Sequence, residues 1–229
     1  MDITTLFRKR PFRLLREGYQ ILWYDLFFEP DGQSGDVLTE TNIGIEVRAS
    51  GVVAFVLDAC DLPLEFVECQ HLQSGRLLEV ALIEDFRKGV IQINACDEAG
   101  FPPGKYRLFF PYTLIGYCDS HLFSLRGELG QTHFADRFFP CDIRSESSAE
   151  FCIDLALRPG QHIVAPNFQL VTEEEVEMCT PADGIKRVEW GVTRRCIRKE
   201  PIHPNDICVL AGDIILPQVS SDPRCHRLN

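Results

Sequence analysis

The chain has 229 residues, of which 45% are hydrophobic and 25% charged, a composition typical of a globular protein and not of a disordered segment. Its 34 acidic and 23 basic residues give a formal net charge of −11. This balance argues against direct binding to nucleic acid, because phosphates demand lysine and arginine. No apolar run is long enough for a membrane helix or the core of a secretory signal, so we expect no membrane partner and a cytoplasmic location.

Residues 1–18 differ from the rest of the chain because they are basic. We interpret them as an N-terminal arm or short helix that Pro11 interrupts, since proline removes a helical hydrogen bond. Its basic side chains are Arg8, Lys9, Arg10, Arg13 and Arg16.

Strand patterns dominate residues 19–125, which we predict to form a β-sandwich-like domain. Hydrophobic residues alternate with polar ones in TNIGIEVRA and GVIQINA, as expected of half-buried strands. GVVAFVLDA is continuously apolar and predicts a strand covered on both faces, whereas RLLEVALIED fits either a strand or a helix. In FPPGKYRLFF we expect Gly104 to make the chain reversal, with Tyr106, Leu108 and Phe110 on the buried face of the following strand.

Residues 126–229 predict a second β-rich domain with a loose C-terminal tail. AEFCIDLAL, IKRVEWGVTRRCIR and DICVLAGDIILP are its strand candidates, and TEEEVEMCTPADG is interpreted as an acidic connector containing at most one helical turn. The predicted fold class is therefore all-β, with two sandwich-like units joined near residues 120–145 and a possible short N-terminal helix.

Ten cysteines are scattered along the chain, and none form a Cys-x-x-Cys pair. Most lie within apolar runs, where a free thiol behaves as a small buried hydrophobe. In a chain without an export signal we expect free thiols, with disulfides or a metal site as the alternatives.

Carboxylates on predicted loops form the candidate binding site. An acidic surface attracts a basic partner and speeds the encounter, although solubility is the simpler explanation of acidity. No nucleophile motif or phosphate loop accompanies these residues, so the sequence indicates a non-catalytic protein-binding module without a cofactor. The candidate partner-binding residues are Asp142, Glu146, Glu150, Glu173, Glu174, Glu175 and Glu177.

The alternative is a metal-dependent enzyme. RPGQHIVAPN, residues 158–167, resembles the second motif of the cupins, in which a histidine binds a metal inside a β-barrel. That resemblance would make His162 a ligand, with His133 as the nearest upstream histidine. The His-x-His element that precedes this motif in cupins is absent from the sequence.

A second resemblance covers residues 19–110. YQILWYDLFFEPD, NIGIEVRASGVVAFVLDA, GVIQINA and FPPGKYRLFF follow one another in an order that resembles the competence-associated inhibitors of DNA-entry nuclease and immunity proteins with a similar β-sandwich. The resemblance implies an acidic protein that blocks a basic nuclease or toxin. It assigns no individual residue.

Overall fold

The computed structural model describes residues 17–31, 34–85, 87–119, 122–125, 135–144, 148–158, 161–165, 168–182 and 185–212. The described residues form β-strands and two short 3-10 helices, η1 (Ala135–Arg137) and η2 (Pro204–Asp206), which confirms the predicted all-β class. None of the helices described is long and apolar enough to cross a membrane. The expected N-terminal arm lies outside the described residues, except for its last two positions.

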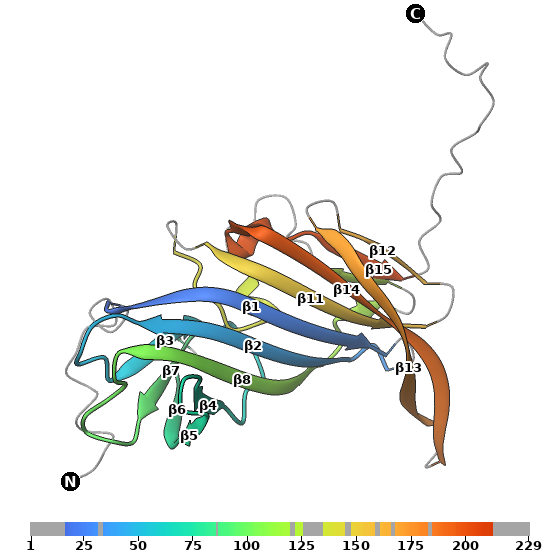
Figure 1. Ribbon diagram of the computed structural model, residues 1–229. Helices are drawn as coiled ribbons and strands as arrows, with labels where there is room; N and C mark the ends of the chain where they lie inside the picture. Colours follow the sequence, from blue (N-terminus) through green and yellow to red (C-terminus); the bar gives the residue numbers. More distant parts are fainter. Residues whose placement is uncertain are drawn as a thin grey trace, which may run out of the picture.

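The largest element is an eight-stranded mixed sheet (Figure 1). Its one parallel pair is β1 with β11, and its other neighbouring strands are antiparallel. The strands follow one another across the sheet in the order β13 (Gln169–Ala182), β14 (Ile185–Ile202), β11 (Ala149–Leu157), β1 (Tyr19–Pro30), β2 (Val37–Val47), β8 (Gly104–Leu114), β4 (Glu68–His71) and β5 (Arg76–Leu78).

Two smaller sheets lie behind the large sheet in Figure 1. One has four strands in the order β12 (His162–Val164), β15 (Val209–Gly212), β10 (Leu122–Leu125) and β9 (Cys118–Asp119). The other has three, in the order β3 (Ala54–Asp58), β7 (Val90–Ala95) and β6 (Val80–Asp85). All five residues of β3 are buried, as its continuous apolar sequence predicted.

The boundary expected near residue 125 falls inside shared sheets. Strands β11, β13 and β14 extend the large sheet built by β1, β2 and β8, while the four-stranded sheet combines β9 and β10 with β12 and β15. A single hydrophobic core also joins residues from both halves of the chain. We therefore describe the protein as one β-rich unit instead of two.

Alternation along the central strands separates the two faces of the large sheet. In β1, Tyr24, Leu26 and Phe28 point into the core, and in β8 the predicted face of Tyr106, Leu108 and Phe110 is fully buried. These side chains pack against the smaller sheets in one core cluster, which therefore lies between the layers. The opposite face of the large sheet is called the outer face below.

Aromatic rings and tyrosine hydroxyls connect the layers. Phe55 of β3 lies 5.2 Å from the Tyr19 ring and 4.1 Å from the Phe101 ring, measured between centroids. The Tyr19 hydroxyl donates to the Val56 carbonyl at 3.0 Å and accepts from the Val56 N–H at 2.9 Å. One phenol thus satisfies both backbone groups of a buried residue in another sheet, as buried polar groups require.

Two local predictions differ from the structure. The acidic stretch TEEEVEMCTPADG lies in strand β13 from Thr172 to Ala182 and is not a connector there, because its backbone pairs with β14 through the register Glu173↔Arg194 to Ala182↔Ile185. The chain reversal before β8 is made at Gly100, which has a φ of +74° and donates to the Asp97 carbonyl at 3.0 Å. Gly104 instead begins β8.

Candidate functional site

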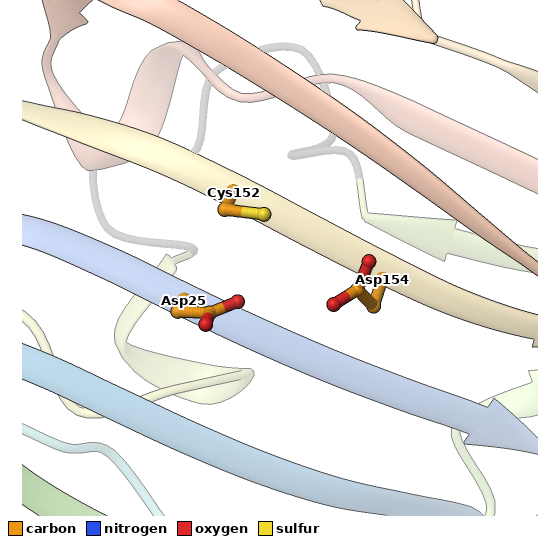
Figure 2. A group of neighbouring side chains, drawn as sticks. All are labelled: Asp25, Cys152 and Asp154. Atoms are coloured by element: carbon orange, nitrogen blue, oxygen red, sulfur yellow. The ribbon is translucent and has the colours of Figure 1, made fainter. Parts of the chain in front are cut away.

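The centre of the outer face carries a compact polar cluster formed by Asp25, Cys152, Asp154 and Arg195. Strand alternation points Asp25 outward from β1, and the parallel register places it beside Cys152 of β11. Asp154 follows two residues later on the same face, and its antiparallel partner is Arg195 of β14. Figure 2 shows Asp25, Cys152 and Asp154 projecting from the two neighbouring strands.

The potential ligand atoms of Asp25, Cys152 and Asp154 all lie within 4.8 Å of one another. Arg195 binds this group directly. Its Nε lies 2.9 Å from the Cys152 Sγ and 3.3 Å from the Asp154 Oδ1, and a terminal nitrogen lies 3.6 Å from the Asp25 Oδ2. The guanidinium therefore supplies the positive charge that two neighbouring carboxylates need.

Burial determines how the cluster titrates. Burial and, to a smaller extent, the neighbouring Asp25 carboxylate raise the pKa of the Cys152 thiol to about 11, against the opposing effect of Arg195. Burial also raises the pKa of Asp154, which Arg195 lowers in part and the carboxylates of Asp25 and Glu174 raise. The thiol is therefore protonated near neutral pH, whereas thiolate is the form that attacks or binds a metal.

A metal ion would have to displace the Arg195 guanidinium and deprotonate Cys152. Metal ligands must lose their protons, so both changes oppose binding. The geometry of the cluster is accordingly that of a charge-paired polar group, and we assign it no metal.

Around the cluster, the outer face carries an excess of carboxylates. In β1, β2, β4 and β11 the carboxylates alternate with buried residues. In β13, Glu174 lies opposite Thr193, two residues before outward Arg195 of β14. Among the described side chains, the strand cations Lys105, Arg107 and Arg195 share this face, and Arg48, just after β2, lies 2.7 Å from the Glu46 carboxylate. We name as the acidic face the eight outward carboxylates, which are Asp25, Glu29, Glu40, Glu46, Glu68, Glu150, Asp154 and Glu174.

Half-buried aromatic side chains lie among these carboxylates. Trp23 and Phe27 project from β1 and Phe109 from β8. The Trp23 indole lies flat over Gly44 of β2, where an added Cβ would fall 2.1 Å from a ring carbon. Glycine at this position therefore creates the space that the indole occupies.

Two residues predicted from sequence join the acidic face. Glu150 is exposed on β11 and its register partner is Trp23. Glu174 is exposed on β13, opposite Thr193, and its charge reaches Asp154. Glu173 points to the other face, where its carboxylate lies 3.2 Å from the Arg194 Nε.

The other predicted residues lie elsewhere. Asp142 is 4% exposed, and its two carboxylate oxygens share the Nε–H of Arg144 at 2.7 and 2.9 Å. Its own backbone N–H donates to the Tyr24 hydroxyl. Such a buried, paired carboxylate fixes the chain locally and is unavailable to a partner. Glu175 and Glu177 lie in β13, but their side chains are outside the described part, as is the whole of Glu146.

Of the two histidines in the cupin-like alternative, the structure describes His162. His162 begins β12 and is exposed, while His133 lies outside the described residues. The group of three potential ligands identified among the described residues does not include His162.

The cysteines are free where the structure describes their side chains. Cys69, Cys141 and Cys196 are buried and Cys96 is exposed, whereas Cys60, Cys152 and Cys208 are half-buried. The prediction of free thiols agrees with these positions, although burial is less general than predicted.

Comparison with known proteins gives a fold but no family. No known family and no curated protein matches the sequence. Among solved structures, a mutant M1 zinc metallopeptidase from Deinococcus radiodurans bound to a Tyr-Ser-Ala substrate is similar over 86% of this chain and 43% of its own, with a TM-score of 0.61 and 14% identity. A mutant two-domain M1 zinc metallopeptidase bound to L-arginine is similar over 85% of this chain and 42% of its own, with a TM-score of 0.61 and 15% identity.

These likenesses concern architecture alone at such low identity. The chain spans less than half the length of the metallopeptidases that it resembles. It therefore has a β architecture that also occurs within a part of those larger chains.

Proposed function

We propose that this chain is a non-catalytic protein-binding module that engages a basic protein through the acidic face. The observation that carries the proposal is the excess of outward carboxylates over cations among the described side chains on one face of the large sheet. Carboxylates gathered on one side of a rigid sheet produce a directed field, which raises the association rate of an oppositely charged partner.

The aromatic residues on this face supply the contact area that charge alone does not. Interfaces are enriched in tryptophan, tyrosine and phenylalanine, and a few such side chains contribute most of the binding energy. Trp23, flat over Gly44, lies beside Glu150, so an apolar contact and a carboxylate are presented together. A partner with arginine or lysine near apolar residues would fit this arrangement.

An inhibitor or immunity protein is the form of this function that we favour. Such a protein blocks a basic nuclease or toxin, whose own nucleic acid site attracts negative charge. The acidic face and the sequence resemblance of residues 19–110 both support this form of the proposal. They indicate the class of partner and do not identify an individual protein.

The enzyme alternatives have less support. A cupin-like centre would need further ligands near His162, which begins an edge strand and is exposed. A zinc peptidase would need two histidines four residues apart with a glutamate after the first, and the six histidines of the sequence do not have this spacing.

The test compares two charge variants that change the net charge equally. Glu40→Gln with Glu150→Gln removes two exposed carboxylates from the acidic face, and Glu65→Gln with Glu98→Gln removes two exposed carboxylates elsewhere. Wild type and both variants are used to capture proteins from the source cells, and the captured basic proteins are identified, purified and measured for association rate. We expect the acidic-face variant to associate several-fold more slowly and the control variant to match wild type.

Ionic strength gives a second readout. The Debye length falls to about 8 Å near 0.15 M salt, so the rate should decrease as salt rises. Equal rates for the two variants, or a rate independent of salt, would show that the acidic face is not the interface.

A further inference from the structure

We propose that the edge of β13 that no described strand pairs with is where the basic partner docks, by adding one of its own extended segments as a further strand of the large sheet. This inference rests on the proposed function and specifies the manner of binding. An edge strand presents backbone N–H and C=O groups that a second chain can pair with, and alternate side chains of the added strand then contact the surface.

The length of β13 distinguishes it from the other edges. It ends the strand order of the large sheet, with β14 as its neighbour, and it has 14 residues. The opposite edge, β5, has three residues, and the edges of the smaller sheets have two to six. Short edge strands are a common protection against unwanted pairing, so β13 is the described edge best able to form an extended ladder.

The side chains at this edge are accessible. All positions from 169 to 174 are exposed, and among them Leu170 and Val171 keep 49% and 48% of their surface accessible. The register Leu170↔Cys196 and Glu173↔Arg194 directs alternate backbone groups toward β14. The alternate groups in between face away from β14, and an added strand would pair with these.

The negative charge of β13 determines which kind of segment can pair with it. Glutamates occupy positions 173, 174, 175 and 177 of β13. Antiparallel pairing of two copies through this run would place carboxylates opposite carboxylates, which is destabilising. A segment rich in lysine or arginine would place opposite charges there, so the same run that disfavours a second copy favours a basic partner.

The position of β13 connects this edge with the acidic face. Glu174 belongs to both, because it is exposed on the edge strand and its charge reaches Asp154 in the central cluster. A basic segment paired with β13 would therefore lie beside the border of the acidic face that Glu174 forms.

The experiment uses the full chain and a labelled eight-residue peptide of alternating lysine and valine. The comparison peptide has the same sequence but is N-methylated at every second residue, which keeps the charge and removes hydrogen-bond donors along one edge. We expect fluorescence anisotropy to show at least about tenfold weaker binding of the methylated peptide, because several backbone hydrogen bonds are lost. Hydrogen exchange should show new protection at alternate amides within residues 169–174 when the unmethylated peptide is bound.

Two variants separate this edge from general acidity. Glu174→Lys should weaken binding of the unmethylated peptide several-fold, whereas Glu98→Lys, an equal charge change at an exposed turn, should leave it near wild type. Equal affinity for both peptides, without new amide protection, would overturn strand addition while leaving the proposed function intact. No binding of either peptide at low salt would also overturn it, and the proposed function would then depend on the comparison of acidic-face variants alone.

Discussion

Removing the Tyr19 hydroxyl should destabilise the protein strongly for so small a change. In Tyr19→Phe the ring keeps its contact with Phe55, but the hydroxyl that bonds both the N–H and the C=O of Val56 is lost. Tyr19 is 8% exposed and Val56 1% exposed, so water cannot readily replace the hydroxyl. The substitution therefore isolates the hydrogen bonds that join β1 to β3.

The magnitude follows from the two backbone groups left unsatisfied. Each unsatisfied group costs about 1–3 kcal/mol when buried, and the phenylalanine avoids burying one hydroxyl, which returns about 1–2 kcal/mol. We therefore expect a net loss of about 1–4 kcal/mol in the free energy of unfolding. Because a chain of this size loses about 2–4 °C in Tm for each kcal/mol, the midpoint should fall by about 2–16 °C.

Urea denaturation measures this loss, and Tyr106→Phe is the matched control. The Tyr106 hydroxyl makes one hydrogen bond, to the Pro102 carbonyl at 2.6 Å, so its removal should cost about half as much. The dependence of the unfolding free energy on urea should be unchanged in both variants, because the surface exposed on unfolding is the same. A loss below about 0.5 kcal/mol for Tyr19→Phe, or a larger loss for Tyr106→Phe, would refute the reasoning.

Three further predictions concern the outer face and the thiols. Gly44→Ala should displace the Trp23 indole, because the new Cβ would fall 2.1 Å from a ring carbon. The displaced indole should shift the tryptophan fluorescence to the red relative to wild type, and an unchanged spectrum would contradict the contact. An alkylating reagent should modify exposed Cys96 in the native protein well before Cys69, because burial raises the pKa of the Cys69 thiol to about 12. Peptide mapping by mass spectrometry would measure the two labelling rates, and equal rates would argue against this burial. Because burial raises the pKa of Asp154, the folded state holds this proton more tightly than the unfolded state, and the resulting stability is lost as pH rises through the folded pKa. The stability of wild type relative to Asp154→Asn, followed by urea denaturation, should therefore fall as pH rises above about 4, the ordinary pKa of an aspartate, and a constant difference would exclude the effect.

Local features of the fold followed from the sequence because they depend on near neighbours. Alternation in β8 identified its buried face, and the continuous apolar run of β3 identified a strand buried on both sides. Both inferences use the two-residue period of a strand, which does not depend on the identity of the neighbouring strand. The stretch now in β13 was misassigned because a run of glutamates has low strand propensity, which pairing with β14 overrides.

The acidic face required the tertiary structure. The sequence alone placed the negative charge in the chain and identified Glu150 and Glu174 as candidates, but it also selected Asp142, which Arg144 holds in a buried pair. Asp25 was not selected, because nothing near it in the sequence marks it as functional.

The sequence by itself thus determined the strand-rich class, the acidic balance and the absence of a recognisable catalytic motif, since each depends on composition or short-range pattern. The tertiary structure decided which strands become neighbours. The parallel pairing of β1 with β11 brings Asp25 beside Cys152 across more than half the chain, and β14 then adds Arg195. Such long-range pairing depends on how whole faces pack to bury the core, which no local window of residues contains.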